Sequence, residues 1–420
     1  MGKHTDLEGL IDEALLRHLP KPDAKFAIAF SGGGDSVALV HSLRAYAARG
    51  HVMIVDHGLR RGSKAEALAA QNQAKSWGFN CDILTWESQQ TTTAIQEKAR
   101  HARYNLMGDR LRALGIRYLL TGHTQGDQAE TCLMRYERKT GWRGAAGMRE
   151  KAYAPLWPAL ARVELIRPLL SCSRQSLRAY NQAHKLDWAD DPSNDNTDFS
   201  RIRARQYLAN KPDLTQLFLT TANEMQNGLR QEQQDLQAWL RKNADISDHG
   251  YVRLKARPRK VELGRLIHAV SGSGGVIDAS ALAALWDRMG RSDFKAATLS
   301  GCQVTTNQAG FLLVCEARRA KGRRELNEAP QGREYSSGTY IWDNRFLVSY
   351  TGKKTVRAQH AFGHINRLTD YVRTVPVAAR VTLPLIRGAQ GEVLAVGSHE
   401  SENLTVRWLG RERLMDSISP

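Results

Sequence analysis

Short apolar runs alternate with helical patterns between residues 24 and 125, and this alternation allows few folds. Strands and helices that alternate with short connections form a mostly parallel sheet with helices on both faces. Ligands of such sheets bind beyond the carboxyl ends of the strands. A capping box at Ser63 and Glu66 marks one helix start. The alternation predicts strands at 26–30, 52–55, 81–86 and 118–121, and helices at 35–48, 63–78 and 94–114.

The pattern changes in the second half of the chain. Residues 213–243 read as one long helix, and residues 248–316 mix strand-like with helical segments. The basic stretch 316–324 reads as a linker, and glycine-bearing turns separate short β-like runs after residue 330. These runs are 340–342, 346–350 and 380–385. Apolar residues approximate one face of the long helix at Met225, Leu229, Leu236, Trp239 and Leu240.

A chain of 420 residues that is 42 % hydrophobic is long and apolar enough for two or three folded domains. We expect a Rossmann-like α/β domain with a parallel sheet and helices on both faces over residues 1–212. A helical and mixed middle domain follows over 213–320, and a small β-rich domain over 330–420.

The chain carries 60 lysine and arginine residues against 43 aspartate and glutamate residues, a formal net charge of +17. Such an excess favours a polyanionic partner, because each phosphate that a basic side chain neutralises releases condensed counterions. A protein that is merely soluble and basic is the plainer alternative. No apolar run approaches the roughly 20 residues that span a bilayer, and no signal pattern opens the chain. We therefore expect a cytoplasmic protein without a membrane partner.

The strongest local signal is a predicted buried strand that runs into three consecutive glycines at the start of a helix. Glycines let the backbone approach a ligand closely, and loop amides form an anion cradle with the positive helix end. Asp35 would repel a phosphate unless a divalent cation lay between them, so it implies Mg²⁺. A glycine-rich turn with Asp35 as helix cap is the alternative. The predicted phosphate loop consists of Ser31, Gly32, Gly33, Gly34, Asp35 and Ser36.

Further polar segments lie near the same edge of the predicted sheet. Asp127 and Glu130 are three apart at a helix start, so both carboxylates project toward the ligand edge. A site for a cationic co-substrate or a second metal competes there with ordinary N-terminal helix acids. Arg100 and Arg103 share a helix face that either clamps phosphates or is solvated. His57 lies where a nucleotide's base and ribose would bind, or belongs to a simple turn.

The phosphate loop resembles the signature of the PP-loop ATP pyrophosphatases, which cleave ATP to AMP and pyrophosphate. Other segments resemble the tRNA(Ile)-lysidine synthetase family within that superfamily, and the resemblance is specific over residues 24–210. The chain departs from the family pattern at Gly126, where an aspartate is usual, and at Thr124, where a histidine is usual. The matching segments are His57–Arg60, Ala99–Tyr104, Gly122–Thr131, Arg167–Leu170, Asp191–Asn194 and Phe199–Arg205.

The resemblance implies a PP-loop ATP-binding catalytic domain over 1–212, followed by two tRNA-binding domains. It implies a ligase that adenylates position 2 of the wobble cytidine of tRNA(Ile) with a CAU anticodon, and then attaches free L-lysine. Within it, the phosphate loop and His57 would bind ATP, with Asp35 on Mg²⁺. Arg103 would neutralise charge that develops on the phosphoryl group, and Asp127 and Glu130 would recognise lysine. Arg135, Arg138 and Arg143 would grip the anticodon stem, unless they form a solvated cationic face.

Two other readings stay open at this point. A tRNA thiolase of the same superfamily would need cysteines to carry sulfur, and the five scattered cysteines offer weak support. Their odd number and the absence of Cys-x-x-Cys spacing also argue against a disulfide framework, an iron–sulfur site and a zinc ribbon. A basic RNA-binding module with an inert nucleotide site is the non-catalytic reading. The sequence leaves the oligomeric state open, a homodimer included.

Overall fold

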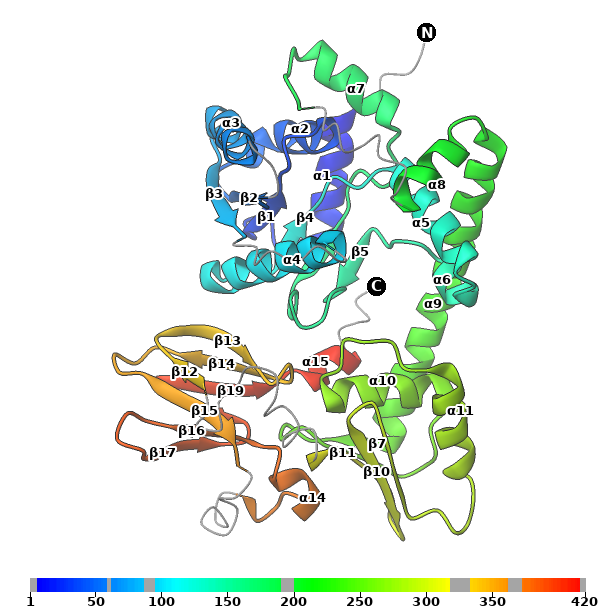
Figure 1. The fold of residues 1–420 in the computed structure, drawn as a ribbon, viewed down its shortest axis with the longest axis vertical. Coiled ribbons are helices and arrows are strands. Elements are labelled where there is room, and N and C mark those ends of the chain that lie inside the picture. The colour runs from blue at the N-terminus through cyan, green and yellow to red at the C-terminus, as the bar shows by residue number, and fades with distance from the viewer. Residues whose placement is uncertain are drawn as a thin grey trace. The chain divides into compact units, whose positions relative to one another are not determined.

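The computed structural model describes residues 6–58, 62–86, 95–189, 200–317, 333–361 and 372–415. The chain forms two compact units (Figure 1). The N-terminal unit comprises residues 1–155 and 162–232, and the C-terminal unit comprises residues 156–161 and 233–420. Within the described ranges, no helix combines the length and apolarity that a membrane crossing demands.

The N-terminal unit is built on one six-stranded sheet with the strand order β3-β2-β1-β4-β6-β5. All neighbouring strands are parallel except β5, which pairs antiparallel with β6 at the edge. The strand order reverses between β1 and β4, where such sheets bind their ligands. This confirms the predicted parallel sheet. The strands are β1 (Phe26–Ala29), β2 (Gly50–Asp56), β3 (Asn80–Thr85), β4 (Tyr118–Leu120), β5 (Lys151–Tyr153) and β6 (Glu164–Ile166).

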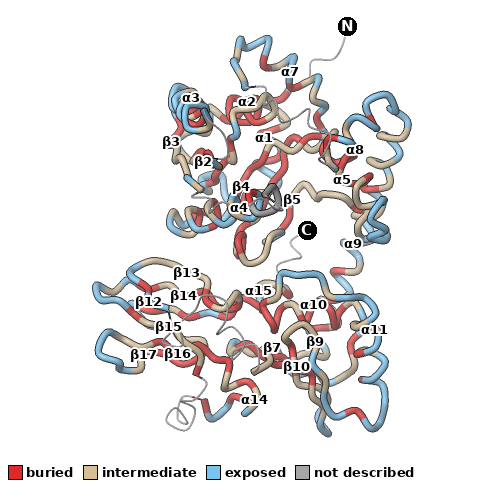
Figure 2. The backbone as a smooth tube through the Cα atoms, viewed as in Figure 1, coloured by how far each residue is buried: buried red, intermediate tan, exposed pale blue. Residues whose placement is uncertain are grey.

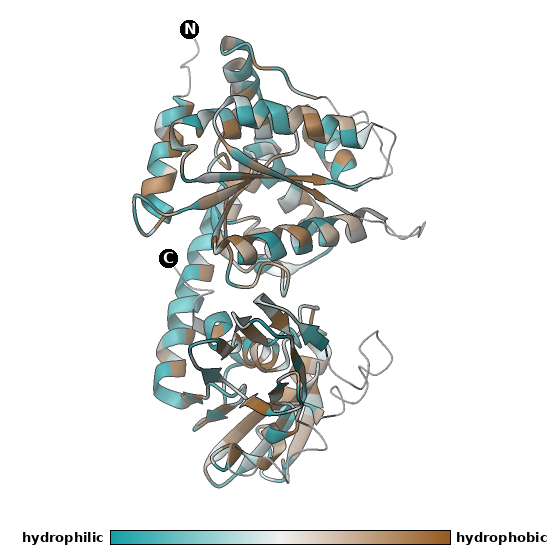
Figure 3. Ribbon diagram, turned by 90° about the vertical axis from the view of Figure 1, so that its left-hand side faces the viewer, coloured by the Kyte–Doolittle hydropathy of each residue, from teal (hydrophilic) through white to brown (hydrophobic). Residues whose placement is uncertain are grey.

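Helices cover both faces of this sheet, and the apolar strands lie between them (Figure 3). Phe26 and Ile28 of β1 point toward one face and share a core cluster with α1, α2, α3 and α7. The side chains of Ala27 in β1 and Met53 in β2 point to the opposite face of the sheet, because successive residues of a strand alternate between its faces. Both side chains are fully buried toward this face, which α4 covers. Figure 2 shows the buried residues along the strands. The helices are α1 (Leu7–His18), α2 (Gly34–Ser42), α3 (Ser63–Ser76), α4 (Ile95–Leu114) and α7 (Arg174–Ala183).

Two helix boundaries differ from the sequence-based expectation. The helix predicted over 35–48 ends at Ser42, and a short 3₁₀ turn (Arg44–Tyr46) follows it. The predicted capping box is wrong because Gly62, with φ of 98°, is the N-cap of α3. Ser63 therefore lies inside the first helical turn, and its hydroxyl makes no capping hydrogen bond.

The remaining helices of the unit are α5 (Gln125–Glu137), α6 (Gly141–Ala145), α8 (Ser200–Leu208) and the start of α9 (Pro212–Asn243). Buried Ala129 and Leu133 of α5 pack against Ala204 and Leu208 of α8. The helix α9 confirms the long helical stretch. Its predicted apolar face is buried at Leu236 and Leu240 and half-buried at Met225, Leu229 and Trp239.

The described residues of the C-terminal unit form three antiparallel sheets. A five-stranded sheet has the order β7-β8-β11-β10-β9, and its strands are β7 (Ala244–Ile246), β8 (Val252–Leu254), β9 (Ala296–Leu299), β10 (Cys302–Asn307) and β11 (Gly310–Cys315). The helices α10 (Lys260–Ser271) and α11 (Ala279–Arg288) pack against it through the same core. These elements confirm the mixed pattern that the sequence predicts after residue 248.

Two four-stranded sheets account for the β-like runs after residue 330, with the orders β12-β15-β16-β17 and β13-β14-β19-β18. The run predicted at 380–385 begins only at Pro384, because Val377–Arg380 form the short helix α14. The first sheet contains β12 (Arg333–Tyr335), β15 (Val356–His360), β16 (Pro384–Arg387) and β17 (Val393–Val396). The second contains β13 (Gly338–Trp342), β14 (Phe346–Tyr350), β18 (His399–Glu400) and β19 (Leu404–Trp408), and α15 (Gly410–Met415) follows it.

The largest hydrophobic core of the C-terminal unit among the described residues joins its middle and last stretches. It joins Leu266 and Val304 of the middle stretch to Phe346 and Trp408 of the last one. The boundary expected between residues 320 and 330 lies outside the described residues, and the separation of a middle from a C-terminal domain stays a prediction.

The stretch 156–161 belongs to the C-terminal unit although it interrupts the N-terminal one in sequence. Ala161 packs in a buried cluster with Leu347 and Leu409. The indole nitrogen Nε1 of Trp157 donates a hydrogen bond to the carbonyl oxygen of Asn344 at 3.0 Å. This short stretch is therefore part of the core of the second unit.

Candidate active site

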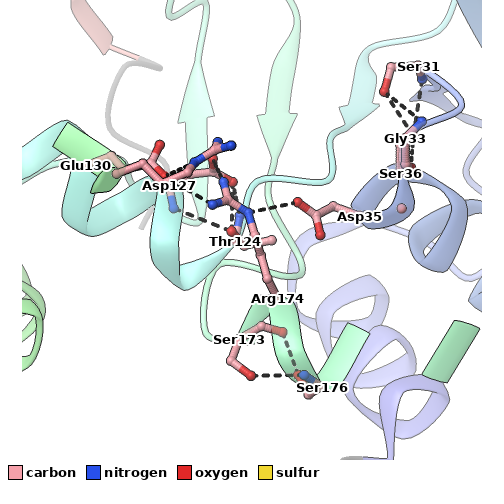
Figure 4. A network of polar contacts seen from close by, with 12 residues as sticks. Ser31, Gly33, Asp35, Ser36, Thr124, Asp127, Glu130, Ser173, Arg174 and Ser176 are labelled. Carbon is pink, nitrogen blue, oxygen red and sulfur yellow. Dashed lines mark hydrogen bonds and ion pairs between the residues drawn. The ribbon is translucent and has the colours of Figure 1, made fainter. Parts of the chain in front are cut away.

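The phosphate loop connects β1 to α2 at the carboxyl end of the parallel strands. Gly32 has a φ of 78°, a backbone conformation that favours glycine. The hydroxyl Oγ of Ser36 donates to the carbonyl oxygen of Gly33 at 2.8 Å and lies 3.1 Å from the hydroxyl Oγ of Ser31 (Figure 4). These contacts fold the loop back on the first turn of α2.

The N-terminus of α2 receives no side-chain cap. Its N-cap is Gly33, and Asp35 lies inside the first turn, so the alternative reading of Asp35 as a helix cap is wrong. Because the first amides of a helix have no partner within it, they are available to an anion at this position. The predicted anion cradle thus has the local structure that it requires.

Asp35 points away from the loop toward Arg174, which lies between three carboxylates (Figure 4). The guanidinium of Arg174 contacts Asp35 Oδ2 at 3.4 Å, Asp127 Oδ1 at 2.8 Å and Glu130 Oε1 at 3.1 Å. Arg174 is the first residue of α7, whose N-cap is Ser173. One arginine therefore links the phosphate loop to the acidic pair.

Two further arginines from α8 complete this acid–arginine network. Arg201 contacts Asp127 Oδ1 at 3.0 Å and Glu130 Oε2 at 3.0 Å, and Arg205 contacts Glu130 Oε1 at 2.9 Å. The side chain of Glu130 is only 2 % exposed. We define the network as Asp35, Asp127, Glu130, Arg174, Arg201 and Arg205, in which three carboxylates face three guanidiniums.

Thr124 and Asp127 form a capping box at the start of α5. The carboxylate oxygen Oδ2 of Asp127 accepts bonds from the amide of Thr124 at 2.7 Å and from its hydroxyl at 2.8 Å. Thr124, where the family pattern has a histidine, thus positions Asp127. Gly126 is the other position that departs from the family pattern. An ideal Cβ on Gly126 would lie 3.6 Å from Nη1 of Arg174, so this position faces the acid–arginine network.

The network sets opposite pKa shifts on its two aspartates. Burial raises the pKa of Asp35, although Arg174 opposes this shift. Burial also disfavours the charged form of Asp127, but Arg201, Arg174 and the capping bond from Thr124 outweigh it and hold the pKa of Asp127 below its usual range. Asp127 is therefore ionised at neutral pH and fixed by its partners.

His57 follows β2 at the same edge of the sheet. Its ring nitrogen Nε2 accepts hydrogen bonds from Nε of Arg103 at 3.2 Å and from Nη2 of Arg103 at 2.9 Å. Burial and the charge of Arg103 lower the pKa of His57 to about 4. The imidazole is therefore neutral, and the structure joins two residues that the sequence placed at the site separately.

A family model described as a PP-loop domain matches residues 6–212. The tRNA(Ile)-lysidine synthase of Hyphomonas neptunium (strain ATCC 15444) is 35 % identical over 317 residues, which cover 72 % of this chain and 85 % of that protein. The chain belongs to the tRNA(Ile)-lysidine synthase family. The family member of Ruegeria pomeroyi (strain ATCC 700808 / DSM 15171 / DSS-3) is 32 % identical, with 81 % and 80 % of the two chains covered. The resemblance found in the sequence is thereby confirmed, as is the PP-loop fold.

The cysteines of this lysidine synthase family member do not favour the thiolase reading. All five are free, and Cys132 and Cys172 are buried. Burial raises the pKa of Cys132 to about 11, which leaves little of the thiolate that carries sulfur. Among the described residues, no three histidine, cysteine, aspartate or glutamate side chains are grouped to hold a metal ion.

The basic residues predicted to contact RNA fall into two groups. Arg138 is exposed, and Arg143 is exposed but forms an ion pair with Glu232. Arg135 differs, because its guanidinium donates to the carbonyl oxygens of Gly147 at 2.7 Å and Gly144 at 3.3 Å. Its contacts stabilise the loop after α6 and do not support the predicted role in gripping a stem.

The sequence reasoning missed Arg174 and gave no role to Arg201 and Arg205. Arg201 and Arg205 are four apart on α8, a spacing that places both on one helix face. This four-residue spacing is the sequence signal that could have indicated a shared role for Arg201 and Arg205. Nothing in the sequence near Arg174 shows that it meets carboxylates 44 to 139 residues away.

Replacing Gly122 by alanine is expected to raise the KM for ATP about fivefold or more. The new Cβ would lie 3.2 Å from the carbonyl oxygen of Asp35 and 3.3 Å from the amide nitrogen of Ser36, so the start of α2 must move. Overpacking of this kind costs about 1–3 kcal/mol. Steady-state kinetics with varied ATP measure the effect. Gly275→Ala is the control, since its Cβ would meet only the hydroxyl of Ser273 at 3.9 Å, and equal KM values would contradict the prediction.

Proposed function

We propose that this chain joins free L-lysine to position 2 of the wobble cytidine of tRNA(Ile) with a CAU anticodon, and converts one ATP to AMP and pyrophosphate. The observation that carries the proposal is the link from the phosphate loop through Arg174 to the buried acidic pair. A nucleotide site and a site for a charged amino acid thus adjoin in a member of the lysidine synthase family.

The phosphate loop supports the first step. Its amides and the hydroxyls of Ser31 and Ser36 bind the phosphates, while the cytidine oxygen attacks the α-phosphorus and pyrophosphate leaves. The carboxylate of Asp35 is 30 % exposed, and Mg²⁺ commonly takes one or two carboxylates together with substrate phosphates. Asp35 would hold the ion, which would neutralise phosphate charge. Arg103, exposed beside His57, adds positive charge for the developing phosphoryl oxygens.

The acid–arginine network supports the second step. A free amino acid brings ammonium and carboxylate groups, and the network offers buried charges of both signs. Asp127 and Glu130 receive the ammonium charge, in exchange for part of their present contacts with Arg174 and Arg201. One of the two carboxylates takes the proton of the ε-ammonium group. The neutral ε-amine then attacks carbon 2 of the adenylated cytidine, the carbon–oxygen bond breaks, and AMP leaves with that oxygen.

Exposed basic and aromatic side chains near α5 and α6 suit contact with RNA. Arg138 and Trp142 are exposed, and Tyr136 is 73 % exposed. Aromatic rings stack on unpaired bases, and guanidiniums pair with phosphates. The net charge of +17 also favours the binding of a polyanion such as RNA.

We place the reaction in the cytoplasm, where a reducing environment matches the five free cysteines.

The test is an incubation of the protein with radiolabelled lysine, ATP, Mg²⁺ and bulk bacterial tRNA. Label is expected to become acid-precipitable and alkali-stable, and to be confined to one isoacceptor while AMP and pyrophosphate accumulate. Release of ADP and orthophosphate, or label that spreads over many tRNAs, would contradict the proposal. A second incubation without ATP is the control.

A further inference from the structure

Arg167 is a buried arginine at the carboxyl edge of the sheet. It follows β6 directly and is only 7 % exposed. Its Nη1 donates to the carbonyl oxygen of Arg149 at 2.6 Å, and its Nε has no hydrogen-bond partner. Within the part of the chain that the structure describes, no carboxylate pairs with Arg167. Such a group is rare, because a buried charge without a partner is costly.

The surroundings of Arg167 add positive charge. Arg100 of α4 and Arg149 lie near enough to disfavour its charged form, and Tyr104 is the group that favours it. Burial lowers the pKa of Arg167 to about 10, so the guanidinium stays charged at neutral pH. We define the Arg167 cluster as Arg100, Arg149 and Arg167. Among the described residues, no ion pair with a carboxylate offsets its charge, and Arg100 lies over the Tyr104 ring at 5.3 Å.

In two other parts of the molecule, buried arginines are paired with carboxylates. Arg345, 1 % exposed, forms an ion pair with Asp343 at 2.7 Å. The arginines of the acid–arginine network face an equal number of carboxylates. Among the described residues, the Arg167 cluster follows neither pattern.

His123 connects the position of the Arg167 cluster to that of the acid–arginine network. His123 follows β4, the neighbour of β6, and its Nδ1 lies 2.8 Å from the hydroxyl of Thr121. Burial and then Arg167 lower the pKa of His123 to about 3, whereas Asp127 acts in the opposite direction. The neutral His123 ring thus lies within electrostatic reach of both the Arg167 cluster and the acid–arginine network.

We propose that the Arg167 cluster binds a phosphate group of the substrates, with the Arg167 guanidinium as its buried anchor. The phosphate comes either from ATP or from the RNA backbone beside the modified cytidine, and the same chemistry recognises both. The inference rests on the proposed function and adds a second phosphate site to it, apart from the phosphate loop.

The test compares Arg167→Met with the wild type in the full-length chain. The dissociation constants for ATP with Mg²⁺ and for an anticodon stem-loop RNA with a CAU anticodon are measured separately. A charge-assisted contact of this kind corresponds to about a 10- to 100-fold change in affinity. A weaker constant for ATP alone identifies the nucleotide phosphate, and a weaker constant for RNA alone identifies the backbone. The melting temperature of the free variant is expected to equal or exceed that of the wild type, because an unpaired buried charge is removed.

The control is Arg117→Met, which removes an exposed arginine just before β4, at the opposite end of the strands. If Arg167→Met binds both ligands as Arg117→Met does, or if it melts well below it, the inference is overturned. Arg149→Met is expected to weaken the dissociation constant for the same ligand. A wild type that binds neither ATP nor RNA would instead overturn the proposed function.

Discussion

Replacing Asp35 by asparagine is expected to slow the formation of AMP and pyrophosphate about 100-fold or more, with little change in tRNA affinity. The carboxylate lies in the first turn of α2 beside the phosphate loop, where it would hold the ion that neutralises phosphate charge. Loss of such electrostatic stabilisation costs several kcal/mol of transition-state energy, and each 1.4 kcal/mol is about tenfold in rate. Release of labelled AMP from α-labelled ATP measures the rate, and filter binding measures tRNA affinity.

Asp213→Asn is the matched control for Asp35→Asn, since Asp213 also lies in the first turn of a helix but is exposed on α9. Asp213→Asn should leave the rate of AMP formation and the tRNA affinity unchanged. An Asp35→Asn variant that still forms AMP at the wild-type rate would remove the proposed role of this carboxylate. A parallel loss of tRNA affinity would show that the substitution disturbs the fold and not the chemistry alone.

Replacing Glu130 by glutamine is expected to lower the free energy of unfolding by about 2–3 kcal/mol and to raise the KM for lysine. The side chain of Glu130 is 2 % exposed and accepts from Arg174, Arg201 and Arg205. Removing one partner of a buried ion pair costs about 3–5 kcal/mol. The arginines are 27 % to 37 % exposed, so water reduces that cost.

Urea unfolding and steady-state kinetics with varied lysine measure the two effects of Glu130→Gln. Glu137→Gln is the control, because Glu137 lies on the same helix and is exposed. Equal urea midpoints for the two variants would show that the network contributes nothing to stability. An unchanged KM for lysine would separate the acidic pair from lysine recognition.

The sheet and the phosphate loop were predictable because their signals are local. The apolar run from Phe26 leads directly into three glycines, and both the strand and the uncapped helix start lie where this pattern places them. The spacing of Asp127 and Glu130 likewise predicted that both carboxylates face one side, and Arg174 and Arg201 contact both of them.

The partners of these carboxylates could not be read from the sequence, since each comes from a distant helix. Arg174 and Arg205 lie 44 and 75 residues from Glu130, and no spacing rule connects such positions. Arg135 shows a second limit of local patterns, because a cluster of basic residues does not reveal which of them donate to backbone carbonyls. The capping box at Ser63 failed because Gly62 adopts a positive φ and takes the N-cap position.

The interleaving of the two units in sequence governs how the protein can be divided. A fragment that ends at Glu232 would retain the entire parallel sheet, yet it would carry Trp157 and Ala161 without Leu347 and Leu409 to cover them. The complementary fragment would lose the same side chains from its interior. Exposed apolar side chains favour aggregation. Truncation at one point therefore damages both halves, and a workable split of the polypeptide needs the segment 156–161 supplied in trans.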